Sequence, residues 1–96
     1  MDFGDHFEWD QAKEISNLAK HGVAFPAAVA AFGDPQRVIL PDLDHSQNEP
    51  RWYCLGRVGE AILTVRFTKR GDRVRIIGAG YWRKGRQLYE TQNRLR

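Results

Sequence analysis

The 96-residue sequence contains a single cysteine, Cys54, and no long hydrophobic run. One thiol cannot form an internal disulfide or supply a cysteine metal cluster, so we expect Cys54 to be a buried structural residue of a strand. The longest apolar stretch, AFPAAVAAF at 24–32, is about half of what crosses a bilayer, which argues against a membrane anchor. The acidic start MDFGDHFEWD lacks the features of a secretory signal, so we expect a cytoplasmic protein.

Acidic residues are scarce in the last third of the chain. Residues 66–96 contain ten Lys and Arg but only two Asp and Glu, whereas residues 1–65 contain five against ten. A basic segment of this kind is typical of proteins that bind phosphate backbones, although an acidic partner protein would fit equally well. The charge distribution therefore slightly favours a nucleic-acid partner.

Turn and capping residues predict one α+β domain spanning residues 1–96. Asp10 suits a helix N-cap and Gly22 a helix stop, and Pro26 opens a second short helix. Period-two patterns and turns predict an antiparallel sheet of about four strands, and the tail from Trp82 onward reads as a helix. The predicted strands are residues 37–40, 51–57, 60–67 and 73–79, with a polar, mobile loop at 42–50. Two N-terminal helices, the sheet and one C-terminal helix would follow in that order.

The first predicted helix has two different sides. Helical spacing puts Ala12, Ile15 and Ala19, with Leu18 beside them, on one side, which we expect to face the core. Lys13, Asn17 and Lys20 line another side, and His21 follows in the last turn. We interpret that second side as chemical, although an ordinary surface helix carries the same pattern.

Arginines of two predicted strands form a candidate phosphate site. Alternation puts Arg73 and Arg75 on one side with Ile77 and Ala79, and places Val74, Ile76 and Gly78 on the other. If the register brings Arg66 beside Arg75, the two cations repel unless an anion lies between them. The alternative is that they diverge, or that each pairs with an acid.

Aromatic and basic residues meet again near the last helix. Tyr81 and Trp82 precede Arg83, Lys84 and Arg86, an arrangement in which bases stack on rings and cations hold phosphates. A core position for Trp82 is the competing interpretation, and we favour it. Trp9 and Trp52 are expected in the core.

The stretch FEWDQAKEISNLAKHGVAF at 7–25 resembles the opening signature of the BrnT family, the toxin half of a bacterial type II toxin–antitoxin pair. GDP at 33–35, the DLDHS loop, TKRGDRVRIIGA at 68–79 and LYE at 88–90 are also similar to the family, so the resemblance covers nearly the whole chain. It implies a RelE-like ribonuclease fold and metal-independent cleavage of RNA, neutralised by a BrnA-like antitoxin. Operator DNA would be contacted only through that antitoxin, and a homodimer is left open.

The implied reaction assigns candidate roles to this chain's residues. In it the 2′-hydroxyl of RNA attacks the adjacent phosphorus, which requires proton transfer and cations for the growing charge. The candidate catalytic residues are Lys20, His21, Arg70, Arg75 and Tyr89, where Tyr89 is alternatively a core contact. The candidate RNA-binding residues are Lys13, Arg66, Lys69, Arg73, Trp82, Arg83, Lys84 and Arg86. No cofactor or metal is expected, because the acidic loop with Asp42, Asp44 and His45 is more typical of a solvated segment.

The chain departs from the family after the last strand. Many members have Ser-Ala-Arg there and a Glu further on, whereas this chain has Gly78-Ala79-Gly80 and Gly85. Arg83 could supply the missing charge from the next turn. The alternative function is a catalytically weakened or inactive homologue that binds an antitoxin or a nucleic acid.

Overall fold

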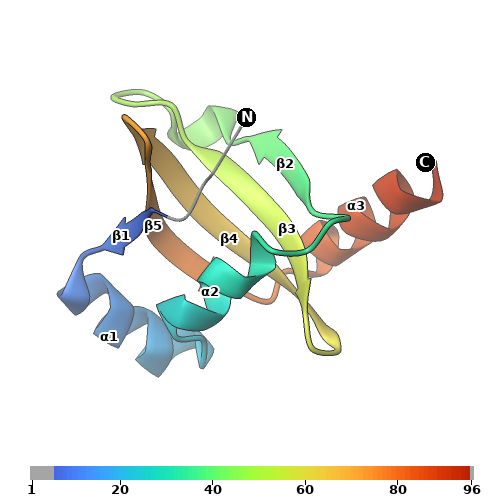
Figure 1. The fold of residues 1–96 in the computed structure, drawn as a ribbon, viewed down its shortest axis with the longest axis horizontal. Coiled ribbons are helices and arrows are strands. Elements are labelled where there is room, and N and C mark those ends of the chain that lie inside the picture. The colour runs from blue at the N-terminus through green and yellow to red at the C-terminus, as the bar shows by residue number, and fades with distance from the viewer. Residues whose placement is uncertain (1–5, 96) are drawn as a thin grey trace.

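A computed structural model describes residues 6–95, which form a five-stranded mixed sheet with three α-helices and one short 3-10 helix. The sheet has the order β1-β5-β4-β3-β2 (Figure 1). Its strands are β1 (Phe7–Trp9), β2 (Val38–Pro41), β3 (Trp52–Val58), β4 (Ala61–Arg70) and β5 (Arg73–Gly80). The helices are α1 (Gln11–His21), α2 (Phe25–Ala31), η1 (Leu43–His45) and α3 (Arg83–Arg94).

Strand β1 corrects the predicted topology. It pairs in parallel with β5, with Phe7 opposite Val74 and Trp9 opposite Ile76. The predicted α+β class and the antiparallel strands β2 to β5 after two helices are confirmed, but the predicted sheet is incomplete, because a fifth, parallel strand comes before α1. A three-residue strand is too short for alternation to identify it. Phe7 and Trp9 pack against the core, so these aromatics belong to the sheet.

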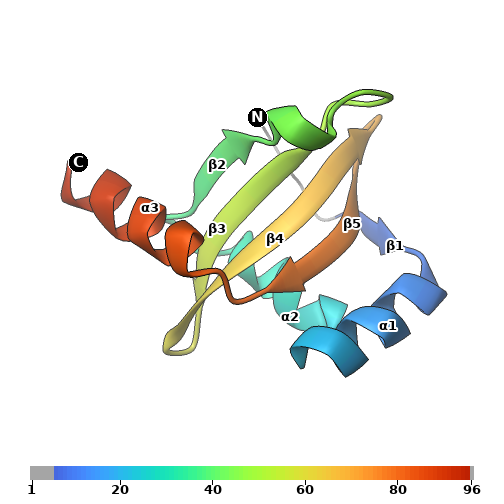
Figure 2. The ribbon, with the colours of Figure 1, turned by 180° about the vertical axis from the view of Figure 1, so that it is seen from behind.

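The two faces of the sheet are covered differently. Helix α2 packs on one face, where residues such as Phe25, Ala28 and Val65 are buried together (Figure 1). Helix α3 packs on the other face, and its Tyr89 joins Leu55 in a second, smaller cluster. Figure 2 shows that face, with α3 across β3 and β4 and α1 beside the β5 edge.

A register shift between β4 and β5 changes which residues share a face. Arg66 lies opposite Gly78 but Phe67 lies opposite Ile76, which leaves Ile77 as an extra residue. Ala79 consequently lies in the core with Val74 and Ile76, so its predicted place beside Arg75 is wrong. Arg75 lies opposite Thr68, so Arg66 and Arg75 are not direct cross-strand partners.

Helix α1 is capped as predicted but turned the other way. Asp10 Oδ1 accepts hydrogen bonds from Ala12 N at 2.8 Å and Lys13 N at 3.2 Å, and Gly22 ends the helix with φ 70°. Ile15 and Leu18 are 62% and 50% exposed, whereas Asn17 is only 8% exposed. The prediction that the apolar side faces the core is therefore wrong, and the polar side faces the sheet.

Other predictions from the sequence are confirmed or corrected locally. Cys54 is buried in β3, and burial raises the pKa of its thiol to about 12. Asp42 is not solvated: it is 2% exposed, and both of its carboxylate oxygens lie 3.0 Å from His45 Nδ1. None of the helices within residues 6–95 is long and apolar enough to cross a bilayer.

Asp34, in the turn between α2 and β2, ties three elements together. Its carboxylate accepts hydrogen bonds from Tyr89 Oη at 2.6 Å, Arg57 N at 2.7 Å and Gln36 N at 2.8 Å. Burial alone would raise the pKa of Asp34, but these hydrogen bonds outweigh it and lower the pKa. Burial and the Asp34 carboxylate both raise the pKa of Tyr89, which keeps the phenol protonated as the donor.

We predict that Asp34→Asn lowers the free energy of unfolding at pH 7 by about 1–3 kcal/mol, because three hydrogen-bond donors lose a charged acceptor. The pKa of Asp34 is depressed in the folded state, so its contribution is complete above the ordinary aspartate value of about 4 and is lost as the pH falls through the folded value. The difference between wild type and variant should therefore shrink in acid. Urea titrations between pH 3 and 7 measure it, with exposed Asp72→Asn as the matched control. An Asp34→Asn difference that does not change with pH would contradict the prediction.

Candidate functional site

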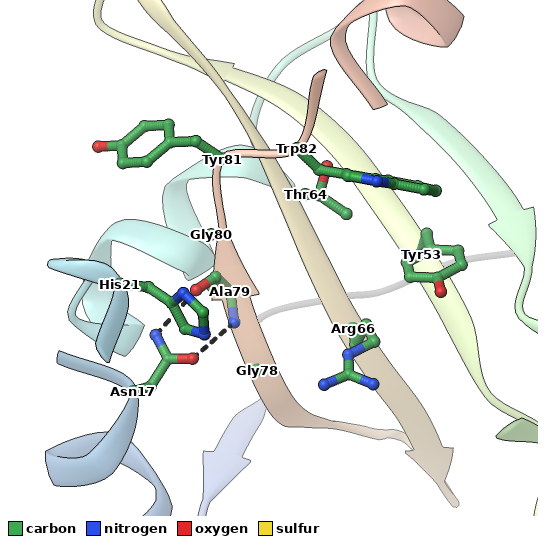
Figure 3. A pocket seen from close by; sticks show the side chains of 10 residues that line it. All are labelled: Asn17, His21, Tyr53, Thr64, Arg66, Gly78, Ala79, Gly80, Tyr81 and Trp82. Carbon is green, nitrogen blue, oxygen red and sulfur yellow. Dashed lines mark hydrogen bonds between the residues drawn. The ribbon is translucent and has the colours of Figure 1, made fainter. Parts of the chain in front are cut away.

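Two adjoining hollows lie beside α1 on the sheet face that α2 does not cover. One has a volume of about 240 Å³ and the other about 180 Å³, and they share Asn17, His21, Arg66 and Gly78. Together we call them the α1 groove, and its larger part is drawn in Figure 3. The remaining lining residues are Lys13, Ser16, Lys20, Tyr53, Thr64, Ile77, Ala79, Gly80, Tyr81 and Trp82.

Asn17 fixes α1 against β5. Its Nδ2 donates to Val23 O at 2.8 Å and to Ala79 O at 2.9 Å, and its Oδ1 accepts from Ala79 N at 3.1 Å. Strand β1 pairs with β5 only as far as Ile76, so Ala79 lies beyond the part of the edge that β1 covers. The carboxamide therefore takes the place of a neighbouring strand by bonding both backbone groups of Ala79 (Figure 3).

This contact places His21 over the end of β5. A Cβ atom built at Gly80 would lie 3.6 Å from His21 Cγ, which is an ordinary contact distance. A Cβ atom at Gly78 would lie 3.6 Å from Arg66 Nη2 and 3.7 Å from Asn17 Oδ1. Because neither glycine has a side chain, Arg66, Asn17 and His21 lie close to the backbone of β5 at the base of the groove.

Arg66 is the central cation of the groove. It lies on β4 between Tyr53 of β3 and Gly78 of β5, and its guanidinium points into the space between Tyr53 and His21 (Figure 3). Within residues 6–95 it forms no ion pair. None of the lining residues is acidic, and Lys13 and Lys20 add two further cations. The groove therefore presents positive charge that an anionic ligand would neutralise.

An aromatic pair closes the far end of the groove. The rings of Tyr53 and Trp82 lie 5.5 Å apart at 35°, whereas the side chain of Tyr81 extends away from them (Figure 3). Trp82 is 40% exposed, so the core position that we favoured for it is wrong. Trp9 and Trp52 pack against the core as predicted. Burial and the nearby Asp42 raise the pKa of Tyr53, so its hydroxyl remains a neutral donor.

Residues 9–85 match a family described as the ribonuclease toxin, BrnT, of the type II toxin–antitoxin system. The chain belongs to this family. No curated protein sequence matches the chain. The matched segment begins in β1 and ends in the first turn of α3, so it contains every residue that lines the α1 groove. Membership of a type II toxin–antitoxin family implies a cognate antitoxin as partner.

The BrnT signature can now be assigned to positions in the fold. Asp10 caps α1, Asn17 holds it on β5, and Gly22 ends it in the left-handed conformation. Trp9 packs edge-on against Phe25 with their ring centroids 5.9 Å apart. Lys13, Lys20 and His21 of the same stretch line the groove. Some residues of the signature therefore stabilise the fold, and others place basic side chains in the α1 groove.

The structure separates the predicted site residues into two groups. Lys13, Lys20, His21, Arg66 and Trp82 come together in the groove. The other group consists of residues that line neither hollow of the groove: Lys69, Arg70, Arg73, Arg75, Arg83, Lys84, Arg86 and Tyr89. The likeness of the fold to RelE-type ribonucleases stays a prediction.

Carboxylates hold four of the predicted arginines. Glu8 accepts from Arg75 at 2.6 Å and from Arg73 at 3.3 Å, while Arg86 pairs with Glu90 at 2.8 Å. Arg70 lies 3.6 Å from Glu49. The hydrogen bond from Arg75 is the main cause of a lowered pKa for Glu8. For Arg75, the alternative of pairing with an acid is therefore the one observed.

Tyr89 has the core role that we named as its alternative. Its side chain is buried, and its hydroxyl donates to Asp34. The residues that sequence reasoning missed are Tyr53 and Thr64, which line the groove together with Arg66. Thr64 Oγ1 is buried in this lining and makes no hydrogen bond to the described residues.

The two glycines at which the chain departs from the BrnT pattern differ in the space around them. A Cβ atom at Gly85 would overlap Thr64 Oγ1 and would lie 3.1 Å from the Trp82 ring and 3.2 Å from Leu55 Cδ2. Gly85 therefore lets α3 approach β4 closely, and a larger residue does not fit this packing. Gly80 has room for a side chain directed toward His21.

We predict that Asn17→Asp lowers the free energy of unfolding by about 1–3 kcal/mol, because a carboxylate cannot donate to Val23 O and Ala79 O. The amide of Ala79 should also exchange its hydrogen faster. Urea denaturation and hydrogen exchange measure the two effects. Asn48→Asp, the same change in an exposed loop, is the control, and equal stabilities of the two variants would contradict the proposed role of Asn17.

We predict that Gly85→Glu lowers the stability measured by thermal unfolding much more than Gly80→Arg does. Gly85→Glu forces α3 away from β4 and should cost about 1–3 kcal/mol by overpacking. Gly80→Arg meets only ordinary contacts and should change stability by about 0.5 kcal/mol or less. Equal losses in the two variants would show that the close approach at Gly85 does not limit the packing.

Proposed function

We propose that this chain is the toxin enzyme of a type II toxin–antitoxin system and that it cleaves RNA in the α1 groove. The observation that carries the proposal is the position of Arg66, which has no carboxylate partner among residues 6–95 and faces His21 across a groove with no acidic lining in that part of the chain. Membership of the BrnT family supports ribonuclease activity as the chemistry.

The proposed reaction uses the substrate's own nucleophile. The 2′-oxygen of RNA forms a bond to the adjacent phosphorus while the bond from phosphorus to the 5′-oxygen breaks. The products are a 2′,3′-cyclic phosphate and a 5′-hydroxyl, and one proton moves from the 2′-oxygen while another reaches the 5′-oxygen. Because the nucleophile is a hydroxyl of the RNA, no metal-activated water is required, and we propose cleavage independent of metal and of any cofactor.

The residues of the groove match the needs of that reaction. An imidazole both accepts and donates protons, so His21 is our first candidate for proton transfer, with Lys20 beside it. Arg66 is placed to stabilise the charge that grows on the phosphoryl oxygens. Lys13 lies in the same hollow and would hold a neighbouring phosphate, while Trp82 offers a ring for a base.

The ion-paired arginines take a lesser part in this proposal. Arg75 and Arg70 are already neutralised by Glu8 and Glu49, so binding a phosphate would first require breaking those pairs. We therefore assign Arg75, Arg70 and Arg73 to the outer RNA-binding surface rather than to the reaction. Tyr89 keeps its structural role with Asp34.

The cationic groove also suggests how an antitoxin would bind. We propose that a BrnA-like antitoxin neutralises the toxin by covering the cationic groove, and that the toxin reaches operator DNA only through that antitoxin. The second candidate function, an inactive binding module, is favoured by one observation: Gly80 has no side chain beside His21, where the family pattern places an arginine.

The decisive test incubates the purified protein with end-labelled RNA in EDTA and identifies the termini of the products. We predict 2′,3′-cyclic phosphate and 5′-hydroxyl ends, and no cleavage where the scissile nucleotide is 2′-deoxy. His21→Asn and Arg66→Gln should each lower kcat/KM by about 10²–10³-fold. Arg86→Gln, outside the groove, is the matched control.

Three results would decide against this assignment. Cleavage that survives both groove variants would place the site elsewhere, and cleavage of the 2′-deoxy substrate would exclude the internal nucleophile. RNA binding without any cleavage would favour the binding module. Thermal melts of each variant show whether a loss of activity reflects a loss of folding.

A further inference from the structure

A third hollow adjoins the α1 groove across the Tyr53–Trp82 pair. Its volume is about 280 Å³, and its walls come from β2, the segment around η1 and the first two turns of α3. Tyr53 and Trp82 line both this hollow and the larger part of the groove. The aromatic pair therefore separates two neighbouring spaces, each bounded by the same two rings.

The chemistry of this hollow differs from that of the groove. Three leucines, Leu40, Leu43 and Leu88, contribute apolar walls, and Leu43 is largely exposed. Lys84 brings one cation, and Asp42 and Asp44 bring two carboxylates. Apolar walls with a few polar groups are typical of sites for a flat, partly polar molecule.

Only one of the two carboxylates is available to a ligand. Asp42 is buried, and both of its oxygens lie 3.0 Å from His45 Nδ1. Asp44 is exposed, and within residues 6–95 its one hydrogen bond is made by its backbone oxygen, which accepts from Gln47 at 3.5 Å. The Asp44 carboxylate therefore offers two unoccupied acceptor oxygens at the wall of the hollow.

We propose that this hollow is a nucleobase subsite that selects guanine in the RNA substrate, an inference that rests on the RNA-cleaving function proposed above. A carboxylate only accepts hydrogen bonds, and the Watson–Crick edge of guanine presents two donors side by side, N1–H and the N2 amino group. Adenine and cytosine present one amino group beside an acceptor nitrogen. Uracil presents one N–H between two carbonyl oxygens, which a carboxylate repels.

The placement of the three hollows favours a nucleic acid over a protein ligand. Cations lie at one end, the two rings lie in the middle, and an acceptor lies beyond them. RNA carries anionic phosphates and stackable bases along one strand, so a strand with a phosphate at Arg66 would bring a neighbouring base to Trp82 and Asp44. Lys84 is placed near a further phosphate.

The test measures binding of short oligonucleotides in which every nucleotide is 2′-O-methylated, because such a strand lacks the attacking hydroxyl. Each is a uridine oligomer that carries one guanosine, inosine, adenosine or cytidine at successive positions. We predict that guanosine at one position binds about 10-fold more tightly than uridine, and that inosine, which lacks the N2 amino group, is intermediate. Fluorescence anisotropy gives the dissociation constants.

Substitutions in the third hollow test whether the guanosine preference arises there. Asp44→Asn should reduce the guanosine preference at least about 5-fold while leaving the affinity for the all-uridine strand unchanged. Asp72→Asn, the same change in the exposed β4–β5 turn, should leave the preference intact. Trp82→Ala should weaken the binding of every oligonucleotide by the same factor. If Trp82 served only to discriminate between bases, the binding of the all-uridine strand would not change.

Each other outcome overturns a defined part of the inference. RNA binding with no preferred base, or a preference that survives Asp44→Asn, would exclude the guanine subsite while leaving the cleavage proposal intact. A preference for guanosine without cleavage of unmodified RNA would retain the subsite and remove the enzyme. No binding of any oligonucleotide would overturn both, and loss of antitoxin binding in Asp44→Asn without a base preference would identify a protein-docking site.

Discussion

The bonding of both backbone groups of Ala79 by the carboxamide of Asn17 is the constraint on which the rest of the structure depends. Strand β5 extends past its short neighbour β1, and an edge of this kind needs a donor and an acceptor together. A carboxamide supplies both, whereas a carboxylate or an aliphatic side chain does not. With α1 held in this way, Ile15 and Leu18 face the solvent, and both backbone groups of Ala79 have a partner that an apolar side chain could not supply. The same rotation brings Lys13, Lys20 and His21 to the sheet face that carries Arg66.

Charge on this face is divided between neutralised and available cations. Glu8 is on β1 and so faces Arg75 directly across the parallel pair, where it holds both Arg75 and Arg73. Arg66 is one strand further in, opposite Gly78, where no acidic side chain is within reach among residues 6–95. Partial burial between Tyr53 and α1 also reduces the screening of its charge by water. The most effective cation for an anion is therefore not in the arginine-rich segment 70–75 but two strands from the sheet edge.

The parts of the fold that the sequence predicted are those with local causes. Asp10 and Gly22 act within one helical turn, and the strands from residue 51 to residue 80 have clear alternation, so their positions follow from neighbouring residues. The Val58–Ala61 turn also fixes the register that puts Tyr53 opposite Arg66, so this pair was predictable from the sequence. The orientation of α1 could not be predicted from the sequence. Its apolar stripe favoured the wrong side, and Ala79, which Asn17 bonds at the edge of β5, is 62 residues away along the chain. The extra residue at Ile77 likewise has no local signal, and it is what turns Ala79 into the core.

Three glycines set how closely other elements pack on the sheet face that carries α3 and the α1 groove. Gly85 lets α3 lie close to Thr64, which sets Trp82 beside Tyr53 at the far end of the groove. Gly78 and Gly80 have no side chains of their own, so Arg66 and His21 lie close to the backbone of β5. A larger side chain at Gly80 would project toward His21, so its absence both removes a possible cation and enlarges the groove. The cationic, aromatic and acceptor regions adjoin one another, because Tyr53 and Trp82 line both the larger part of the groove, which contains Arg66, and the hollow that contains Asp44.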